Sequence, residues 1–175
     1  MNEEAVILGI LREMGLTDER IAAAGDILRE SGLRGLASET VISHGDLYPL
    51  NVVSREGELI ILDWEYIHLN SVYWDLYNLI DITSPSYRRN VVGRENRAAI
   101  LGDYRSERES LGKRVSADFV RGYHYYCAVY SMWILLLIES DMKSRRFAEG
   151  ALAEQRAETF QILQEMLDVL AEPEG

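Results

Sequence analysis

The segment 41–64 constrains the fold most, because it interrupts a chain whose pattern is otherwise helical. Its first part, SHGDLYPLN (residues 43–51), contains Gly45 and Pro49, which exclude a regular helix there. Two β-rich runs follow, 51–53 and 59–62, on either side of the polar turn REGE (residues 55–58). Two β-rich runs separated by a glycine-containing polar turn predict a β-hairpin.

Apolar residues recur at helical spacing on both sides of this interruption. We expect helices over 3–14 and from 17 to about 32 before it, with a loop over 33–40. After it, helices are expected over 73–81, 94–110, 117–140 and 145–171, with breaks at Pro85 and Gly112. The sequence therefore predicts an α+β, mostly α-helical chain with 1–175 as a single domain, divided into 1–40 (helices), 41–64 (loop and hairpin) and 73–171 (helical subdomain).

The charge balance argues against a nucleic acid as partner. The 175 residues contain 18 Lys and Arg against 29 Asp and Glu, which gives a formal net charge of −11. Proteins that bind a phosphate backbone usually present a basic surface. An acidic chain favours a cationic small molecule or a metal ion, although acidity also serves solubility.

Cysteine usage and hydropathy indicate a cytoplasmic protein. The single Cys127 cannot form an internal disulfide, and a structural zinc site would want several thiolate or imidazole ligands, whereas the chain has one Cys and three His. The N-terminal residues are acidic, unlike a signal peptide. The longest apolar stretch, 127–138, is shorter than the ~20 residues that span a bilayer, so no membrane partner is expected.

The candidate chemistry lies in the interruption itself. Asp46 and Asn51 are separated by four residues, and Asp63 follows the second apolar run of the hairpin. A tight loop and a hairpin can bring these three side chains to one end of a sheet. Two carboxylates and an amide oxygen suit Mg²⁺ that is bound partly by protein and partly by substrate phosphates. In that arrangement Asp46 would accept the proton of an attacking hydroxyl, while Asn51 and Asp63 would hold the metal.

Two motifs, HGDLYPLN (44–51) and ILDWE (61–65), resemble the aminoglycoside phosphotransferase and choline/ethanolamine kinase superfamily. The resemblance implies a protein-kinase-like C-terminal lobe with a short β-hairpin carrying the catalytic loop. It also implies ATP as co-substrate, Mg²⁺ as cofactor, and transfer of the γ-phosphoryl group to a substrate hydroxyl. Asp46 takes the place of the family's base, and Asn51 and Asp63 take the places of its magnesium ligands.

Two finer expectations also follow from this resemblance. Asp75 matches a further family aspartate that supports the catalytic loop. The stretch around 63–78 and the aromatic helix 119–133 resemble the choline-kinase branch, where aromatic faces and a carboxylate hold a quaternary ammonium group. Glu65 and Tyr130 are therefore the candidate substrate-binding residues, and choline-like molecules, amino alcohols and aminoglycosides are the candidate acceptors.

The family's N-terminal nucleotide lobe has no counterpart in this sequence. About 40 residues precede the loop; they are helical in pattern, and residues 1–60 contain no lysine for the ATP phosphates. We expect the chain to correspond to a C-terminal lobe alone, as an excised domain, a short gene product, or half of a split enzyme. Alone it should have little activity, and a separate N-terminal lobe, a partner chain or a homodimer would complete the site.

Simpler interpretations compete with several of these assignments. His44 is more easily explained as a hydrogen-bonding residue that supports the loop than as a proton shuttle. The stripe Tyr123, Tyr126, Tyr130 and Trp133 has the spacing of a core-packing face as well as that of a substrate wall. The alternative function is a catalytically silent, kinase-derived module for binding or dimerisation.

Overall fold

The computed structural model describes residues 3–34, 39–87, 91–144, 147 and 149–172. Their contacts form two compact units. We call 1–34 with 83–175 the helical unit, and 35–82 the mixed unit. Helices dominate and the strands are few, so the mostly helical α+β class is confirmed.

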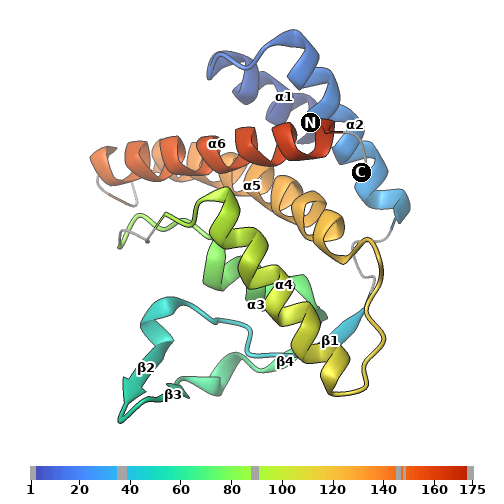
Figure 1. Ribbon diagram of the computed structural model, residues 1–175. Helices are drawn as coiled ribbons and strands as arrows, with labels where there is room; N and C mark the ends of the chain where they lie inside the picture. Colours follow the sequence, from blue (N-terminus) through green and yellow to red (C-terminus); the bar gives the residue numbers. More distant parts are fainter. Residues whose placement is uncertain (1–2, 35–38, 88–90, 145–146, 148, 173–175) are drawn as a thin grey trace. The chain divides into compact units, whose positions relative to one another are not determined.

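The helical unit is built around one long central helix. It comprises α1 (Glu3–Glu13), α2 (Asp18–Arg34), α4 (Arg94–Ser110), α5 (Phe119–Ser144) and α6 (Glu149–Ala171). Helix α5 contacts each of the other four, and Figure 1 shows α6 running along it. The inward face of α5 buries large side chains such as Tyr123, Met132 and Leu135. Removing this apolar surface from water is the main stabilisation of the unit.

The helix limits agree closely with the pattern in the sequence. Helix α4 has the predicted bounds, while α5 continues to Ser144 because no breaking residue follows position 140. Helix α2 passes Gly32 and ends at Arg34, since a lone glycine weakens a helix by ~1 kcal/mol without ending it. The expected loop over 33–40 falls partly on residues 35–38, which lie outside the described residues. Within the described part of the chain, no helix is long and apolar enough to cross a membrane.

The mixed unit combines two separate two-stranded antiparallel sheets with one helix. Strand β1 (Thr40–Ser43) pairs with β4 (His68–Ser71), and β2 (Val52–Arg55) pairs with β3 (Glu58–Ile61). Short 3-10 turns, Pro49–Asn51 and Trp64–Tyr66, connect them, and α3 (Tyr73–Ile80) ends the unit. The hairpin is confirmed, whereas β4 and its pairing with β1 were not predicted.

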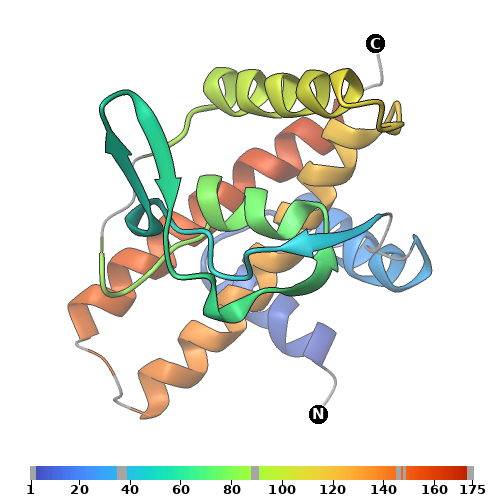
Figure 2. The same ribbon diagram turned by 90° about the horizontal axis from the view of Figure 1, so that it is seen from below.

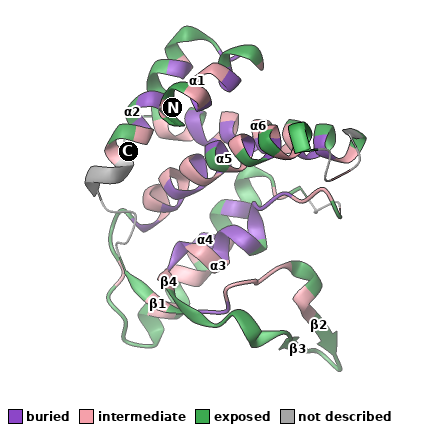
Figure 3. Cartoon of the chain, turned by 180° about the vertical axis from the view of Figure 1, so that it is seen from behind, coloured by how far each residue is buried: buried purple, intermediate pink, exposed green. Residues whose placement is uncertain are grey.

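The β2–β3 hairpin is largely exposed on both faces. Glu56 and Gly57 form its turn, with φ of 54° and 86°, the conformation that matches the twist of a tight hairpin. All four residues of β3 are exposed, including Leu59 at 74% (Figure 3). Figure 2 shows the two strands as an isolated ribbon. A ribbon with such apolar residues is marginal in water unless another surface covers it.

Candidate active site

A single carboxylate on α3 fixes the start of the motif loop. Asp75 accepts three hydrogen bonds: from the Ser43 hydroxyl at 2.8 Å, from the His44 backbone N–H at 2.7 Å, and from the Gly45 backbone N–H at 3.1 Å. Charged acceptors make the stronger hydrogen bonds. The loop is therefore tied to the first turn of α3, about 30 residues further along the chain.

The backbone at Gly45 is shaped by this attachment. Gly45 has φ of +88°, a region that side chains disfavour, and its carbonyl accepts a hydrogen bond from the Trp74 indole at 2.9 Å. A Cβ at this position would lie 2.3 Å from the carbonyl oxygen of Tyr66 and 2.9 Å from His68 Nδ1. The loop thus passes so close to the chain before β4 that no side chain fits there.

The imidazole of His44 is buried and bonded to backbone at both nitrogens. Its Nε2 lies 2.8 Å from the carbonyl oxygen of Leu62 and must be the donor, because a carbonyl only accepts. Its Nδ1 accepts from the Asp46 backbone N–H at 3.3 Å. The Trp64 ring lies beside it, with centroids 4.7 Å apart. His44 therefore joins the Asp46 loop to the Asp63 segment as a neutral ring, which favours its structural role.

Asp46 and Asn51 are in direct contact. The Asn51 side-chain amide donates to the Asp46 backbone carbonyl at 2.8 Å and to its carboxylate Oδ2 at 3.4 Å. Backbone bonds from Tyr48 to Asp46 and from Asn51 to Tyr48, each 2.9 Å, close the turn between them. Because its nitrogen is used in this way, Asn51 presents its amide oxygen as the available ligand atom.

Asp63 lies next to this pair through its neighbour Leu62. The Leu62 N–H donates to the Asn51 carbonyl at 2.8 Å, and the Leu62 carbonyl accepts from His44. Asp63 itself is exposed and left-handed, with φ of 64° and ψ of 58°. Non-glycine residues in this region are uncommon and cluster at functional sites. The sequence predicted the proximity of Asp63 to Asn51 but carried no signal for this backbone conformation.

Three carboxylates, those of Glu65, Asp46 and Asp63, raise the pKa of the Tyr66 phenol. The pKa of Tyr66 is raised above its usual value by the charge of Glu65 and a hydrogen bond to it, then by burial and by the charges of Asp46 and Asp63. The pKa of Tyr48 is raised first by burial and then by the charge of Asp46. Each of these charges disfavours a negative charge on the nearby phenol, so the loop and the chain after β3 together form a negative region.

These two phenols can report on the carboxylates. Asp46→Asn is expected to lower the pKa of both Tyr48 and Tyr66, because it removes a negative charge that acts on each. Asp63→Asn is expected to lower the pKa of Tyr66 alone. A titration of ¹³C-labelled tyrosine by NMR above pH ~9 measures both values against the ordinary value of about 10. Equal effects of the two substitutions on Tyr48 would contradict the arrangement.

The two expected substrate-binding residues belong to different units. Glu65 is exposed in the mixed unit, whereas Tyr130 is half-buried on α5 of the helical unit. Tyr130 stacks on Tyr126 at 4.3 Å and meets the Trp133 ring edge at 6.1 Å. Tyr126 is buried and Trp133 is 47% exposed, so the predicted aromatic stripe runs from core to surface. It serves packing at one end and presents aromatic surface at the other.

The donor chemistry near Asp63 fits a magnesium ion. No group of three or more His, Cys, Asp or Glu that could hold a metal occurs among the described residues. The expected set differs from such a cluster, since it pairs the Asp63 carboxylate with the Asn51 amide oxygen. These are hard oxygen donors, and a site of one or two carboxylates completed by substrate phosphates is typical of Mg²⁺.

Comparison with family models identifies the phosphotransferase enzyme family (APH), which matches residues 9–110, more than half of the chain. The chain belongs to this family. The match includes the complete loop, both sheets and α3, and so covers every residue of the candidate site except Tyr130. Neither the curated proteins nor the solved structures provided a significant match.

Within this phosphotransferase-family chain, several contributors to the site were not predicted. Ser43 bonds Asp75 through its hydroxyl, Trp74 bonds the Gly45 carbonyl, and Leu62 acts through its backbone. Two of these left a trace in the sequence: a polar Ser43 ends a short strand, and an indole precedes Asp75. A backbone contribution such as that of Leu62 leaves none.

Proposed function

We propose that this chain is the C-terminal lobe of a kinase-like small-molecule phosphotransferase. The reaction transfers the γ-phosphoryl group of ATP to a hydroxyl of a small cationic molecule. The observation that carries the proposal is the closed connection among three segments: Asp46 bonded to Asn51, Asn51 to Leu62, and Leu62 to His44. It fixes the family's acid and amide side chains in one loop system.

Asp46 is the proposed base. Its side chain is partly exposed, and one carboxylate oxygen receives only the long Asn51 contact at 3.4 Å. In the proposed step the acceptor oxygen bonds to the γ-phosphorus as the bond to the bridging oxygen of ADP breaks. The hydroxyl proton passes to Asp46, and the released electron pair stays on ADP. A positioned base of this kind contributes typically about 10²–10⁴-fold to the rate.

Asn51 and Asp63 are the proposed magnesium ligands. A Mg²⁺ ion held by these two residues would supply positive charge to the phosphates during the transfer. The chain's own contribution is to hold both ligand residues in place. Asn51 is held by its side-chain bond to the Asp46 carbonyl. Asp63 is held through its neighbour Leu62, whose N–H bonds the Asn51 carbonyl and whose carbonyl accepts from His44. The left-handed backbone of Asp63 adds local strain that this network supports.

The charge of the mixed unit supports a cationic acceptor. Residues 35–82 contain one Arg and no Lys, against eight acidic residues, and Glu65 is the first cause of the raised pKa of Tyr66. A quaternary or primary ammonium group beside Glu65 would be attracted by this negative charge. Choline-like molecules, amino alcohols and aminoglycosides are the proposed acceptors.

The shortage of positive charge in the mixed unit also supports a contribution from outside this lobe. ATP phosphates need more positive charge than one magnesium ion and Arg55, which lies at the end of β2 next to the hairpin turn. The exposed apolar ribbon β2–β3 also needs a cover. We propose that a nucleotide-binding lobe or partner chain, or a second copy of this chain, supplies the additional positive charge and covers the hairpin.

Calorimetric titration with ATP and Mg²⁺ tests nucleotide binding first. This lobe alone is expected to bind weakly but saturably, and Asp63→Asn should weaken the binding at least about tenfold further, because the substitution removes a charged metal ligand. Glu56→Gln is the matched control, since it removes one exposed carboxylate from the hairpin turn of the same unit. Equal affinity for the three proteins would reject Asp63 as a metal ligand.

Acceptor selection is tested with γ-labelled ATP and pairs of molecules that differ in charge. We expect choline to be phosphorylated in preference to 3,3-dimethylbutan-1-ol, its neutral counterpart of similar shape, because Glu65 favours the cation. Ethanolamine and an aminoglycoside complete the set. Magnesium-dependent ATP binding without transfer to any acceptor would favour the alternative, a silent binding module, which the exposed hairpin would suit as a dimerisation surface.

A further inference from the structure

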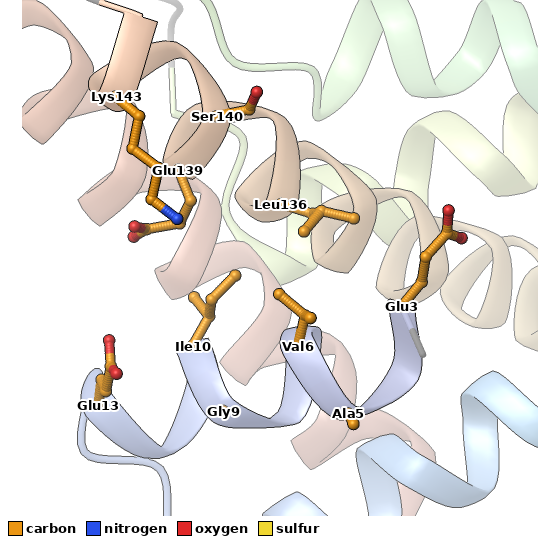
Figure 4. A pocket seen from close by; sticks show the side chains of 10 residues that line it. All are labelled: Glu3, Ala5, Val6, Gly9, Ile10, Glu13, Leu136, Glu139, Ser140 and Lys143. Carbon is orange, nitrogen blue, oxygen red and sulfur yellow. The ribbon is translucent and has the colours of Figure 1, made fainter. Parts of the chain in front are cut away.

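A groove in the helical unit lies outside the family's motif loop. It runs between α1 and α5 and has a volume of about 520 Å³. Figure 4 shows side chains from both helices facing this space. The volume falls within the range of ligand sites, about 300–1,000 Å³. Both helices belong to the same compact unit, so the groove is a feature of that unit alone.

The floor of the groove is apolar. Val6 and Ile10 line it from α1, and Leu136 lines it from α5. Gly9 lies between the two α1 residues, and a Cβ placed there would meet no atom within 4 Å. A glycine at this position leaves that part of the lining open, at a cost of ~1 kcal/mol in helix stability relative to alanine.

The rim of the groove is exposed and mainly acidic. Glu3 and Glu13, at the two ends of α1, are exposed and have no cationic partner among the residues that the structure describes. Glu13 follows Glu3 by ten positions of helix, a distance of about 15 Å along the axis. On α5, Glu139 is already paired with Arg156 at 2.7 Å, and the exposed Lys143 lies at one end. The α1 side therefore carries two uncompensated negative charges.

We propose that this groove binds an amphipathic helix with basic residues, contributed by another protein. The walls follow two helices, and the exposed rims leave one face of the occupant in water, which suits a helix with one apolar face. Its apolar side chains, spaced i, i+3, i+4 and i+7, cover Val6, Ile10 and Leu136. Its Lys or Arg side chains, about three turns apart, lie near Glu3 and Glu13. The net charge of −11 on the whole chain also favours a basic partner.

A synthetic peptide tests the proposal on the intact chain. The probe is a fluorescein-labelled helical peptide with leucines at i, i+3, i+4 and i+7 and a lysine beyond each end of this stripe. Fluorescence anisotropy measures its affinity. We expect it to bind at least about tenfold tighter than a peptide with glutamate in place of both lysines, and than one with the same composition in scrambled order.

Two glycine substitutions separate the groove from the fold. Gly9→Leu adds a side chain to the lining of the groove and is expected to weaken peptide binding at least about tenfold, while circular dichroism shows an unchanged or raised Tm. Gly102→Leu is the matched control, because Gly102 is also half-buried within a helix and has no atom within 4 Å of its Cβ position. It should leave binding unchanged within about twofold.

The charged residues give a second readout. Replacing Glu3 and Glu13 together with glutamine is expected to weaken binding about fivefold and to flatten its dependence on salt. Peptide affinity that is the same for wild type and Gly9→Leu would overturn the proposal. So would equal affinity for the lysine and glutamate peptides, or binding of a long-chain alkylammonium ion without binding of the lysine peptide. None of these outcomes bears on ATP binding, which depends on the mixed unit.

Discussion

Replacement of Asp46 by asparagine is expected to lower kcat for phosphoryl transfer about 10²–10⁴-fold, the contribution of a positioned base. Asparagine has the same shape but cannot take the hydroxyl proton. The backbone carbonyl of residue 46 still accepts the 2.8 Å bond from Asn51, so the turn is retained. Affinity for Mg·ATP should therefore change little. Single-turnover transfer from γ-labelled ATP, with calorimetric binding on the same samples, measures both quantities.

The control for this prediction is Glu56→Gln, which removes one negative charge from the same unit at the exposed hairpin turn. It should retain kcat within about threefold, because it touches neither the loop nor Asp63. If Asp46→Asn also retained kcat within that range, Asp46 would not be the base. A loss of Mg·ATP affinity equal to the loss of kcat would instead assign Asp46 to metal binding.

Local patterns in the sequence were sufficient for most of the helices and for the hairpin. Helices α4 and α5 follow apolar spacing and breaking residues, and the β2–β3 turn follows from Gly57. The pairing of β1 with β4 was missed, because Ile42 and Leu69 pair across a separation of 27 positions. Both are about 70% exposed, so no burial pattern marks either strand.

The candidate site also combines features that the sequence predicted with features that it did not. The residues proposed to carry the chemistry could be named from the sequence, since Asp46, Asn51 and Asp63 occur at the spacing of a known motif. The network that orients them was not, because it uses backbone groups and a left-handed conformation at Asp63. Side-chain identity is visible in a sequence, whereas a carbonyl such as that of Leu62 is common to every residue. Glycine is the partial exception, because it marks positions where the backbone itself has a special requirement.

Gly45 is such a position, and Gly45→Ala is expected to destabilise the chain by about 2–5 kcal/mol. A left-handed backbone costs alanine about 1–2 kcal/mol, and overpacking adds typically about 1–3 kcal/mol. The overpacking arises because the new methyl group would lie 2.3 Å from the Tyr66 carbonyl oxygen, which is backbone and cannot rotate away. Relief requires movement of the loop or of the chain before β4, which would break the Gly45 bonds to Asp75 and Trp74. Urea unfolding followed by tryptophan fluorescence measures the change in the free energy of unfolding.

Gly57→Ala isolates the cause of that loss. Gly57 has φ of +86°, nearly that of Gly45, but a Cβ there would meet no atom within 4 Å. Gly57→Ala should therefore lose only the stability that a left-handed backbone costs alanine, about 1–2 kcal/mol, and leave Mg·ATP binding unchanged. The difference between the two variants measures the close approach of the loop to Tyr66. Equal losses would mean that the contact relaxes without cost, in which case Gly45 would serve conformation only and the attachment of the loop to α3 would tolerate a side chain.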